Sequence, residues 1–216
     1  QSASPSCALL VRLDQFGNEE LRVRYNVASA VSVIGYGIDK TLDNNYVISG
    51  TKGGLAFISE IDTLGNVLWV KEYNVTTSGP DVVLYIKTTP DGGYITGRSS
   101  GALSTTSKTW ALKTDSLGTI QFSKSFNTCL SSNSGSEFIP TFDNGFAFSS
   151  GDLGMNAYAL IKTDSALSQS QACIETNFPT TETPTTFLNV IGLSFIRASI
   201  VTSIVAQQNI FLPDTA

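Results

Sequence analysis

The sequence repeats one short acidic turn about every 50 residues. The pattern Asp-x-x-Gly begins at Asp14, Asp62 and Asp115, and a fourth copy, at Asp164, lacks the glycine. The four aspartates are 48, 53 and 49 residues apart. A period of this length is typical of chains that use one supersecondary unit several times. The repeat therefore constrains the fold before composition is considered.

A second marker keeps phase with the first. It reads Asp43-Asn44-Asn45-Tyr46, then Asp91-Gly92-Gly93-Tyr94, then Asp143-Asn144-Gly145-Phe146, and it follows the first marker by 29, 29 and 28 residues. Two markers that hold their spacing through three cycles indicate an internal repeat. The seven aspartates are therefore assigned to structural turns of the repeat.

Each marker predicts a hairpin turn. An aspartate side chain accepts hydrogen bonds from backbone N–H groups two residues on, and glycine supplies the positive φ that closes the loop. The flanking residues alternate with a period of two: after Gly65, one face holds Val67, Trp69, Lys71 and Tyr73. This is the periodicity of a strand with one buried face. Four short antiparallel strands per repeat are typical of a propeller blade.

The fold class we expect is all-β, with four-stranded antiparallel repeats that form a small β-propeller of about four blades. Residues 1–177 form the repeat domain, although the N-terminus supplies only the last two strands of its blade. Residues 178–216 form a Thr-rich linker and a β-strand tail that closes the ring or joins a neighbouring subunit. Within the tail, Phe187–Val205 is expected to supply the missing first two strands, because it is rich in Val, Ile, Phe and Thr, and Asn209–Asp214 reads as one surplus strand.

Two stretches, Thr89–Tyr94 and Lys113–Ser116, resemble the DGGY-type repeats of secreted β-propeller surface proteins of the Bacteroidota, which are cargo of type IX secretion. The resemblance covers roughly residues 8–177 and implies a β-propeller outside the cell or at its surface. The family usually carries more blades than this chain supplies. The start at Gln1 is read as a mature N-terminus left by removal of a secretory signal, with a trimmed chain as the alternative.

The same resemblance implies O-glycosylation at Asp followed by Ser or Thr and then a small or aliphatic residue. Four sites fit this pattern, at Thr63, Ser116, Ser165 and Thr215. The first three fall on predicted exposed turn tips, where a glycan is readily accommodated, although an unmodified turn explains the motif equally well. Asn74 begins the sequence's N-linked sequon, Asn-Val-Thr.

The sequence contains no histidine, which excludes Ser-His-Asp and Cys-His nucleophiles and every His-ligated metal site. Because the repeated aspartates are assigned to turns, a carboxylate pair for glycoside hydrolysis would have to draw on Asp81, Glu137 or Asp152. Calcium at Asp43-Asn44-Asn45 or at Asp143-Asn144 is an alternative, although both stretches lack a full ligand loop. We therefore expect no enzyme activity, no cofactor and no metal.

Charge and hydropathy narrow the range of partners. The net charge is −5 and no basic run is present to neutralise phosphates, so nucleic acid is not expected. No run of 18 apolar residues occurs, so no membrane insertion is expected. Trp69 and Trp110 are assigned to the core, with stacking on a sugar ring as the alternative. The pairing of Cys7, Cys129 and Cys173 stays open.

These patterns predict a non-enzymatic, secreted structural protein of the cell surface. The split first blade and the segment Phe187–Leu212, which carries one Arg and no acid, favour self-assembly into a filament or array through terminal strands. The alternative is an adhesin module of the propeller type that binds glycans or other ligands through non-repeating loops such as Ser99–Ser107 and Asn127–Ser136. Those loops lack aromatic residues.

Overall fold

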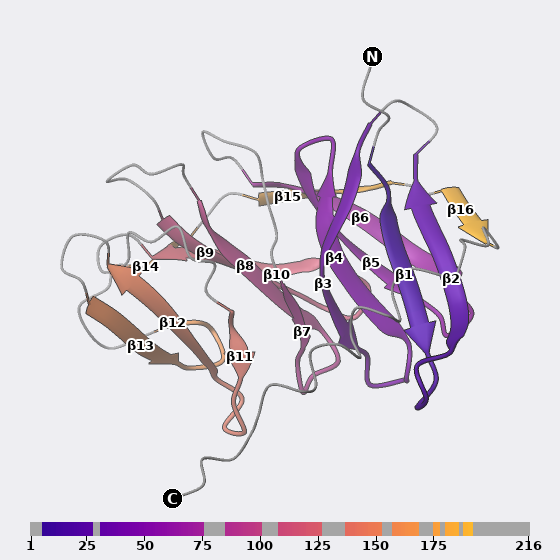
Figure 1. Ribbon diagram of the computed structural model, residues 1–216. Coiled ribbons are helices and arrows are strands. Elements are labelled where there is room, and N and C mark those ends of the chain that lie inside the picture. Colours follow the sequence, from indigo (N-terminus) through magenta and orange to yellow (C-terminus); the bar gives the residue numbers. More distant parts are fainter. Residues whose placement is uncertain are drawn as a thin grey trace, which may run out of the picture.

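The all-β prediction is confirmed: in the computed structural model, the described residues form sixteen strands in four antiparallel sheets (Figure 1). The structure describes residues 6–27, 31–75, 85–100, 108–126, 137–152, 157–168, 175–177, 180–185 and 188–191. Each of the four sheets contains one repeat of the sequence.

The first repeat contributes two strands and the next two repeats contribute four each, as predicted. The first repeat is β1 (Ala8–Leu13) and β2 (Glu19–Asn26). The second is β3 (Val33–Lys40), β4 (Tyr46–Lys52), β5 (Leu55–Ile61) and β6 (Val67–Val75). The third is β7 (Ile86–Thr88), β8 (Tyr94–Ser100), β9 (Lys108–Thr114) and β10 (Ile120–Phe126). The described part of the fourth is β11 (Ile139–Pro140), β12 (Phe146–Asp152) and β13 (Ala157–Thr163).

The acidic turns are equivalent in all four repeats, as the spacing predicted. Each aspartate N–H donates to the carbonyl oxygen four residues on, and each aspartate carbonyl oxygen accepts from the N–H three residues on, at 2.8–3.1 Å. One carboxylate oxygen accepts the N–H groups two and four residues on, at 2.7–2.9 Å. The left-handed position is held by Gly17, Gly65 and Gly118, and in the fourth turn by Leu167 with φ of 57°.

The second marker also forms the predicted turn in each of its three copies. In each turn a threonine hydroxyl donates to the carboxylate two residues on: Thr41 to Asp43, Thr89 to Asp91, and Thr141 to Asp143. The left-handed residue is asparagine or glycine, the types that adopt this conformation most readily, at Asn44, Gly92 and Asn144.

The inner sheets are buried on both faces, whereas the alternation of the sequence predicted one buried face. On β10, Phe126 is fully buried, and so is Ser125 on the opposite face. On β6, Tyr73 and Val70 are both buried although they also point to opposite faces. The reason is that each inner sheet packs against a neighbouring sheet on both of its faces, through the clusters of buried apolar residues that join successive repeats.

The described C-terminal strands lie along the outer edges of the sheets. β14 (Glu175–Asn177) pairs with β10, β15 (Thr180–Pro184) pairs with β6, and β16 (Leu188–Ile191) pairs with β2. The prediction that Phe187–Val205 supplies the strands missing from the first blade is therefore wrong for its described part. β16 adds to the outer strand β2 because that strand offers a row of backbone groups for pairing. Residues 192–205 and 209–214 lie outside the described part of the chain.

The four sheets form an open series. Contacts join β1 to β3, β3 to β7, and β7 to β11. The sheets that hold β1 and β13 stand at opposite ends of the series in Figure 1. In the described residues the predicted ring is therefore not closed within one chain.

Candidate functional site

Neighbouring repeats stack through the same positions each time. We number the strand before each acidic turn back from the turn aspartate, so that Leu13, Ile61, Thr114 and Thr163 are all at position −1. The residues at −1, −3 and −5 face the preceding repeat, and those at −4 and −6 face the following one. In the second and third repeats the residues that face back are at most 2% exposed: Phe57, Ser59, Ile61, Trp110, Leu112 and Thr114.

Three apolar clusters correspond to the three interfaces between repeats. Ala8 and Leu10 of the first repeat pack with Phe57 and Ile61 of the second. In the same way, the cluster between the second and third repeats joins Ala56 and Ile58 to Trp110 and Leu112. The cluster between the third and fourth repeats joins Ala111 and Phe126 to Ile161 and Leu167. Because the burial of apolar area is favourable, each repeat is stabilised when a neighbouring repeat covers this apolar face.

A tyrosine hydroxyl makes a hydrogen bond across each of the first two interfaces. The Tyr25 hydroxyl donates to the Gly65 carbonyl oxygen at 3.0 Å, and the Tyr73 hydroxyl donates to the Gly118 carbonyl oxygen at 2.6 Å. Burial raises the pKa of both phenols, so each stays a neutral donor. The third interface has Phe126 at the equivalent place, and it lies in one apolar cluster with Leu167.

Polar side chains repeat across the interfaces in the same way. The Lys71 ammonium donates to the Thr119 hydroxyl at 3.2 Å, and the Lys124 ammonium donates to the Ser168 hydroxyl at 3.1 Å. Both lysines lie nine residues after their turn aspartate, and both acceptors lie four residues after the next one. One stacking geometry therefore recurs along the chain.

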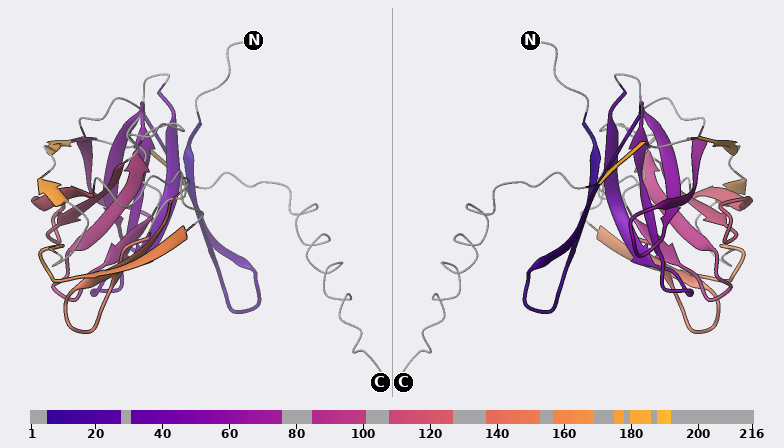
Figure 2. Two further views of the ribbon diagram at one scale, coloured as in Figure 1. Left: turned by 90° about the vertical axis from the view of Figure 1, so that its left-hand side faces the viewer. Right: turned by 90° about the vertical axis from the view of Figure 1, so that its right-hand side faces the viewer.

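The first repeat exposes the face that the other repeats bury. Leu9, Val11 and Leu13 occupy positions −5, −3 and −1, and they are 54%, 39% and 54% exposed. Both views in Figure 2 place the β1–β2 hairpin at one extreme of the molecule, with the other sheets on one side of it. This apolar face, which we call the open face, consists of Leu9, Val11 and Leu13.

The turn beside the open face is also uncovered. A Cβ built on Gly65 would lie 2.4 Å from Val23 Cγ2, and one built on Gly118 would lie 2.6 Å from Trp69 Cζ3, because the preceding repeat packs against both turns. A Cβ built on Gly17 would meet no atom within 4 Å. Among the described residues, no neighbouring repeat packs against the first turn as one does against the second and third turns.

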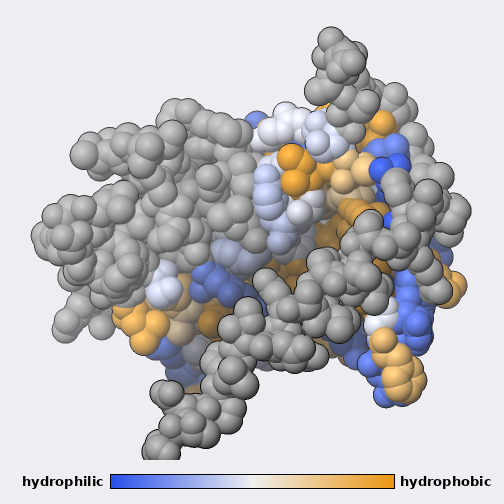
Figure 3. Space-filling model, viewed as in Figure 1, coloured by the Kyte–Doolittle hydropathy of each residue, from blue (hydrophilic) through white to orange (hydrophobic). Residues whose placement is uncertain are grey.

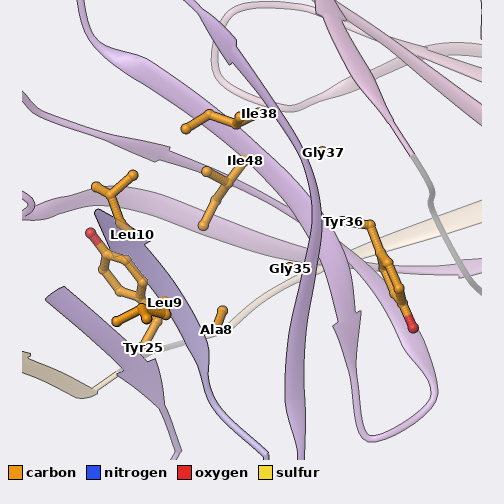
Figure 4. A pocket seen from close by; sticks show the side chains of 9 residues that line it. All are labelled: Ala8, Leu9, Leu10, Tyr25, Gly35, Tyr36, Gly37, Ile38 and Ile48. Atoms are coloured by element: carbon orange, nitrogen blue, oxygen red, sulfur yellow. The ribbon is translucent and has the colours of Figure 1, made fainter. Parts of the chain in front are cut away.

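β1 also has an unpaired edge and an apolar groove beside it. Among the described residues β1 pairs with β2 alone, whereas β5 and β9 pair on both edges. A groove of about 180 Å³ runs between β1 and β3, and in Figure 4 Leu10, Ile38 and Ile48 point into it while Tyr36 projects to the other side of β3. Figure 3 shows hydrophobic residues at the surface in this region. In the second repeat, Val47 of β4 is buried in the cluster that joins this repeat to the third.

At the opposite end of the series, one described residue of the complementary face is exposed. Leu160 is at position −4 of the fourth repeat, where Leu10, Ile58 and Ala111 of the other repeats are at most 9% exposed, and it is itself 82% exposed. The two ends of the described series therefore differ. The first repeat exposes residues that elsewhere pack against the preceding repeat, and the fourth repeat exposes a residue whose equivalents pack against the following repeat.

In the second and third repeats, the charged residue at position −2 is buried and hydrogen-bonded. The Lys113 ammonium is buried and donates to Asp91 at 2.8 Å, to the Thr114 carbonyl oxygen at 2.9 Å and to Gln121 at 2.9 Å. Glu60 occupies the same place in the second repeat. It accepts from Asn45 at 2.9 Å, from the Trp69 indole at 3.0 Å and from the Tyr94 hydroxyl at 3.1 Å. These networks stabilise each repeat, since a buried charge is tolerated only when it is paired.

The two tryptophans lie where the sequence placed them. Trp110 is 2% exposed within the core. Trp69 is half-buried and packs against the same cluster, with its ring centroid 6.0 Å from that of Tyr94.

The candidate glycosylation sites stay predictions. Thr63, Ser116 and Ser165 are exposed at the tips of the acidic turns, and Thr215 lies outside the described residues. Asn74 is exposed on β6, where it pairs with Thr181 of β15.

The candidate carboxylates are not brought together by the described residues. Glu137 is exposed and pairs with the Lys87 ammonium at 3.0 Å, and Asp152 ends β12. Asp81 lies outside the described part. The Asp43 carboxylate accepts from Thr41 and Asn45 within its own turn, and no group of three potential metal ligands occurs among the residues described.

Cys7 carries a free thiol in the described part of the chain, which does not include Cys129 or Cys173. Of the candidate ligand loops Ser99–Ser107 and Asn127–Ser136, residues 101–107 and 127–136 also fall outside it, and Ser99 and Ser100 end β8.

No family model matches the chain, and no curated protein is found to be similar. None of the described segments forms a helix that could cross a membrane.

Proposed function

We propose that this chain is a non-enzymatic structural protein that assembles with copies of itself through its terminal strands. The observation that supports the proposal is the first repeat. Its open face, its uncovered Gly17 turn and the free edge of β1 are all surfaces that the same chain covers in its later repeats. An apolar face joined to an unpaired strand edge is a surface on which other chains associate.

A secreted, cell-surface location belongs to the same proposal. It rests on the DGGY-type repeats and on a polar surface rich in Ser, Thr, Asn and Gly rather than in charge, since only 14% of residues are charged. Assembly outside the cell would give a protein with this composition a structural or adhesive role.

The C-terminal tail is the second element of the proposal. β16 ends at Ile191 beside β2, in the same sheet as β1. The 25 residues that follow span up to about 80 Å when extended, at about 3.3 Å per residue, and we propose that they pair with the β1 edge of a second copy. They contain apolar runs that suit the groove lined by Leu10, Ile38 and Ile48.

A closed four-bladed propeller is the competing geometry. Closure within one chain would bury the open face against Leu160 of the same chain, and the protein would then be a single-copy particle. The adhesin alternative stays a prediction, because its loops fall outside the described residues.

Electron microscopy and particle mass test the proposal. The full chain should form filaments or multi-copy arrays, and a chain that ends at Ile191 should remain largely as single copies. A chain that lacks only Asp214, Thr215 and Ala216 is the control and should assemble normally. Isolated single-copy particles of the full chain at every concentration would contradict self-assembly.

A further inference from the structure

We propose that copies associate head to tail, with the Leu160 face of the fourth repeat of one copy stacked on the open face of the first repeat of the next. This inference rests on the proposed self-assembly and adds a contact between repeats to the strand contact that the proposal gives to the tail, so that stable assembly needs both. The contact would continue, from one chain to the next, the stacking that joins the repeats within a chain.

The interfaces between repeats within the chain show which kind of surface packs against the positions that form the open face. In the second and third repeats, residues at −5, −3 and −1 are covered by residues at −4 and −6 of the repeat before. Leu9, Val11 and Leu13 are aliphatic and present the same positions without that cover. The partner with matching chemistry is therefore the forward face of a repeat of this same type.

The fourth repeat presents Leu160, the described residue at the matching position. Leu160 is 82% exposed at position −4, where Ile58 and Ala111 are fully buried against a following repeat. Within one chain these two surfaces stand at opposite ends of the series (Figure 1). Contact between two copies would bury the open face of one copy against the Leu160 face of the other. Such a contact joins two different surfaces and is therefore heterologous.

The uncovered turn agrees with this arrangement. Side chains of the preceding repeat lie close to Gly65 and Gly118, whereas no described atom lies within 4 Å of a Cβ built on Gly17. A repeat stacked on the open face would lie against Gly17 as Val23 lies against Gly65.

A heterologous contact extends without limit unless its rotation closes a ring. Head-to-tail stacking of an open series therefore gives a filament or a closed ring of several copies. Either product has a mass that is a multiple of the 23.0 kDa chain.

Two one-sided variants test the inference. Leu9→Glu blocks the receiving end, and Leu160→Glu blocks the inserting end. Both side chains are more than half exposed, so neither change should alter the fold, which circular dichroism and thermal unfolding will check. Leu68→Glu, at a residue 52% exposed in the middle of the series, is the matched control.

Each blocked variant alone should be a single copy, and an equal mixture should form a dimer of twice the chain mass that grows no further, because only one productive contact remains. Leu68→Glu should assemble like the unmodified chain. Blocked variants that still assemble would overturn the head-to-tail inference and leave self-assembly standing. Assembly lost in Leu9→Glu but kept in Leu160→Glu would indicate a symmetric contact and also overturn it. An unmodified chain that never assembles would overturn both proposals.

Discussion

The Tyr73 hydroxyl donates to the Gly118 carbonyl oxygen at 2.6 Å, across the interface between the second and third repeats. The donor lies eleven residues after one turn aspartate, and the acceptor lies three residues after the next. Tyr25 and Gly65 repeat the relationship one module earlier. The acidic turn thus does more than reverse the chain, since it also provides the surface on which the preceding repeat is fixed.

Replacement of Tyr73 by Phe should destabilise the fold by about 1 kcal/mol, because the buried Gly118 carbonyl would lose its partner while the ring stays in place. Tyr25→Phe should cost a similar amount. Chemical denaturation of each variant measures the change. A pair of variants as stable as the unmodified chain would show that the hydrogen bond contributes nothing.

At the third interface, adding a hydroxyl should destabilise the protein, whereas at the first two interfaces removing one should. Phe126 is fully buried and lies in one cluster with Leu167 and Phe148. Phe126→Tyr would bury a hydroxyl in this apolar environment, at a cost of about 1–3 kcal/mol. An unchanged midpoint of unfolding would mean that the hydroxyl finds an acceptor there.

Gly118→Ala and Gly17→Ala form a matched pair. Both glycines have positive φ, 74° and 82°, so both substitutions carry the left-handed penalty of about 1 kcal/mol. At Gly118 the new Cβ would also come within 2.6 Å of Trp69 and 2.8 Å of the Tyr73 hydroxyl oxygen, which should raise the total to about 3 kcal/mol.

The unfolding free energies of the two variants should therefore differ clearly, provided that they are measured on single copies. Equal losses in the two variants would contradict the claim that the first turn lacks a neighbour.

Leu167→Gly should destabilise the protein although it relieves a left-handed leucine. Relief of that conformation is worth about 1 kcal/mol. Loss of the fully buried side chain costs about 2–5 kcal/mol. The net loss should be at least about 1 kcal/mol, visible as a lower unfolding temperature, and a gain in stability would reverse our assignment of Leu167 to the core.

Acid should weaken the turns. The Asn66 side chain donates to the Asp62 carboxylate and, with backbone N–H groups, holds the pKa of Asp62 below its ordinary value of 3.8, and Asn18 does the same for Asp14. A carboxyl whose pKa is lowered by folding binds fewer protons when folded, so its contribution is present above about pH 4 and is lost as the pH falls below it.

The unfolding temperature should therefore fall between about pH 5 and pH 2, and Asp62→Asn should make that fall shallower. Asn66→Ala retains the carboxylate but removes one donor, so it should also reduce the slope. A slope that is the same in all three proteins would exclude the turn carboxylates as its source.

The sequence was sufficient to predict the turns of the repeats and the strands that flank them. Asp14, Asp62, Asp115 and Asp164 mark equivalent hairpins, because turn chemistry is local and depends on a few neighbouring residues. The missing glycine of the fourth turn was visible, but its replacement by a left-handed Leu167 was not, because leucine rarely takes that conformation.

The stacking contacts and the C-terminal strands were harder to predict. Tyr25, Tyr73 and Phe126 keep the period of the aspartates and were a readable signal for the interfaces. The pairing of β14, β15 and β16 with outer strands depends on backbone hydrogen bonds, which leave little trace in side-chain pattern. The open face became recognisable only when its buried equivalents in later repeats were known.

A dilution series by sedimentation velocity tests the central claim most directly, namely that one chain leaves a repeat face that another copy covers. The full, unmodified chain should sediment as species whose masses are multiples of 23.0 kDa and whose average size rises with concentration. A single 23.0 kDa species at every concentration would show that no second copy covers the open face, and would contradict the account.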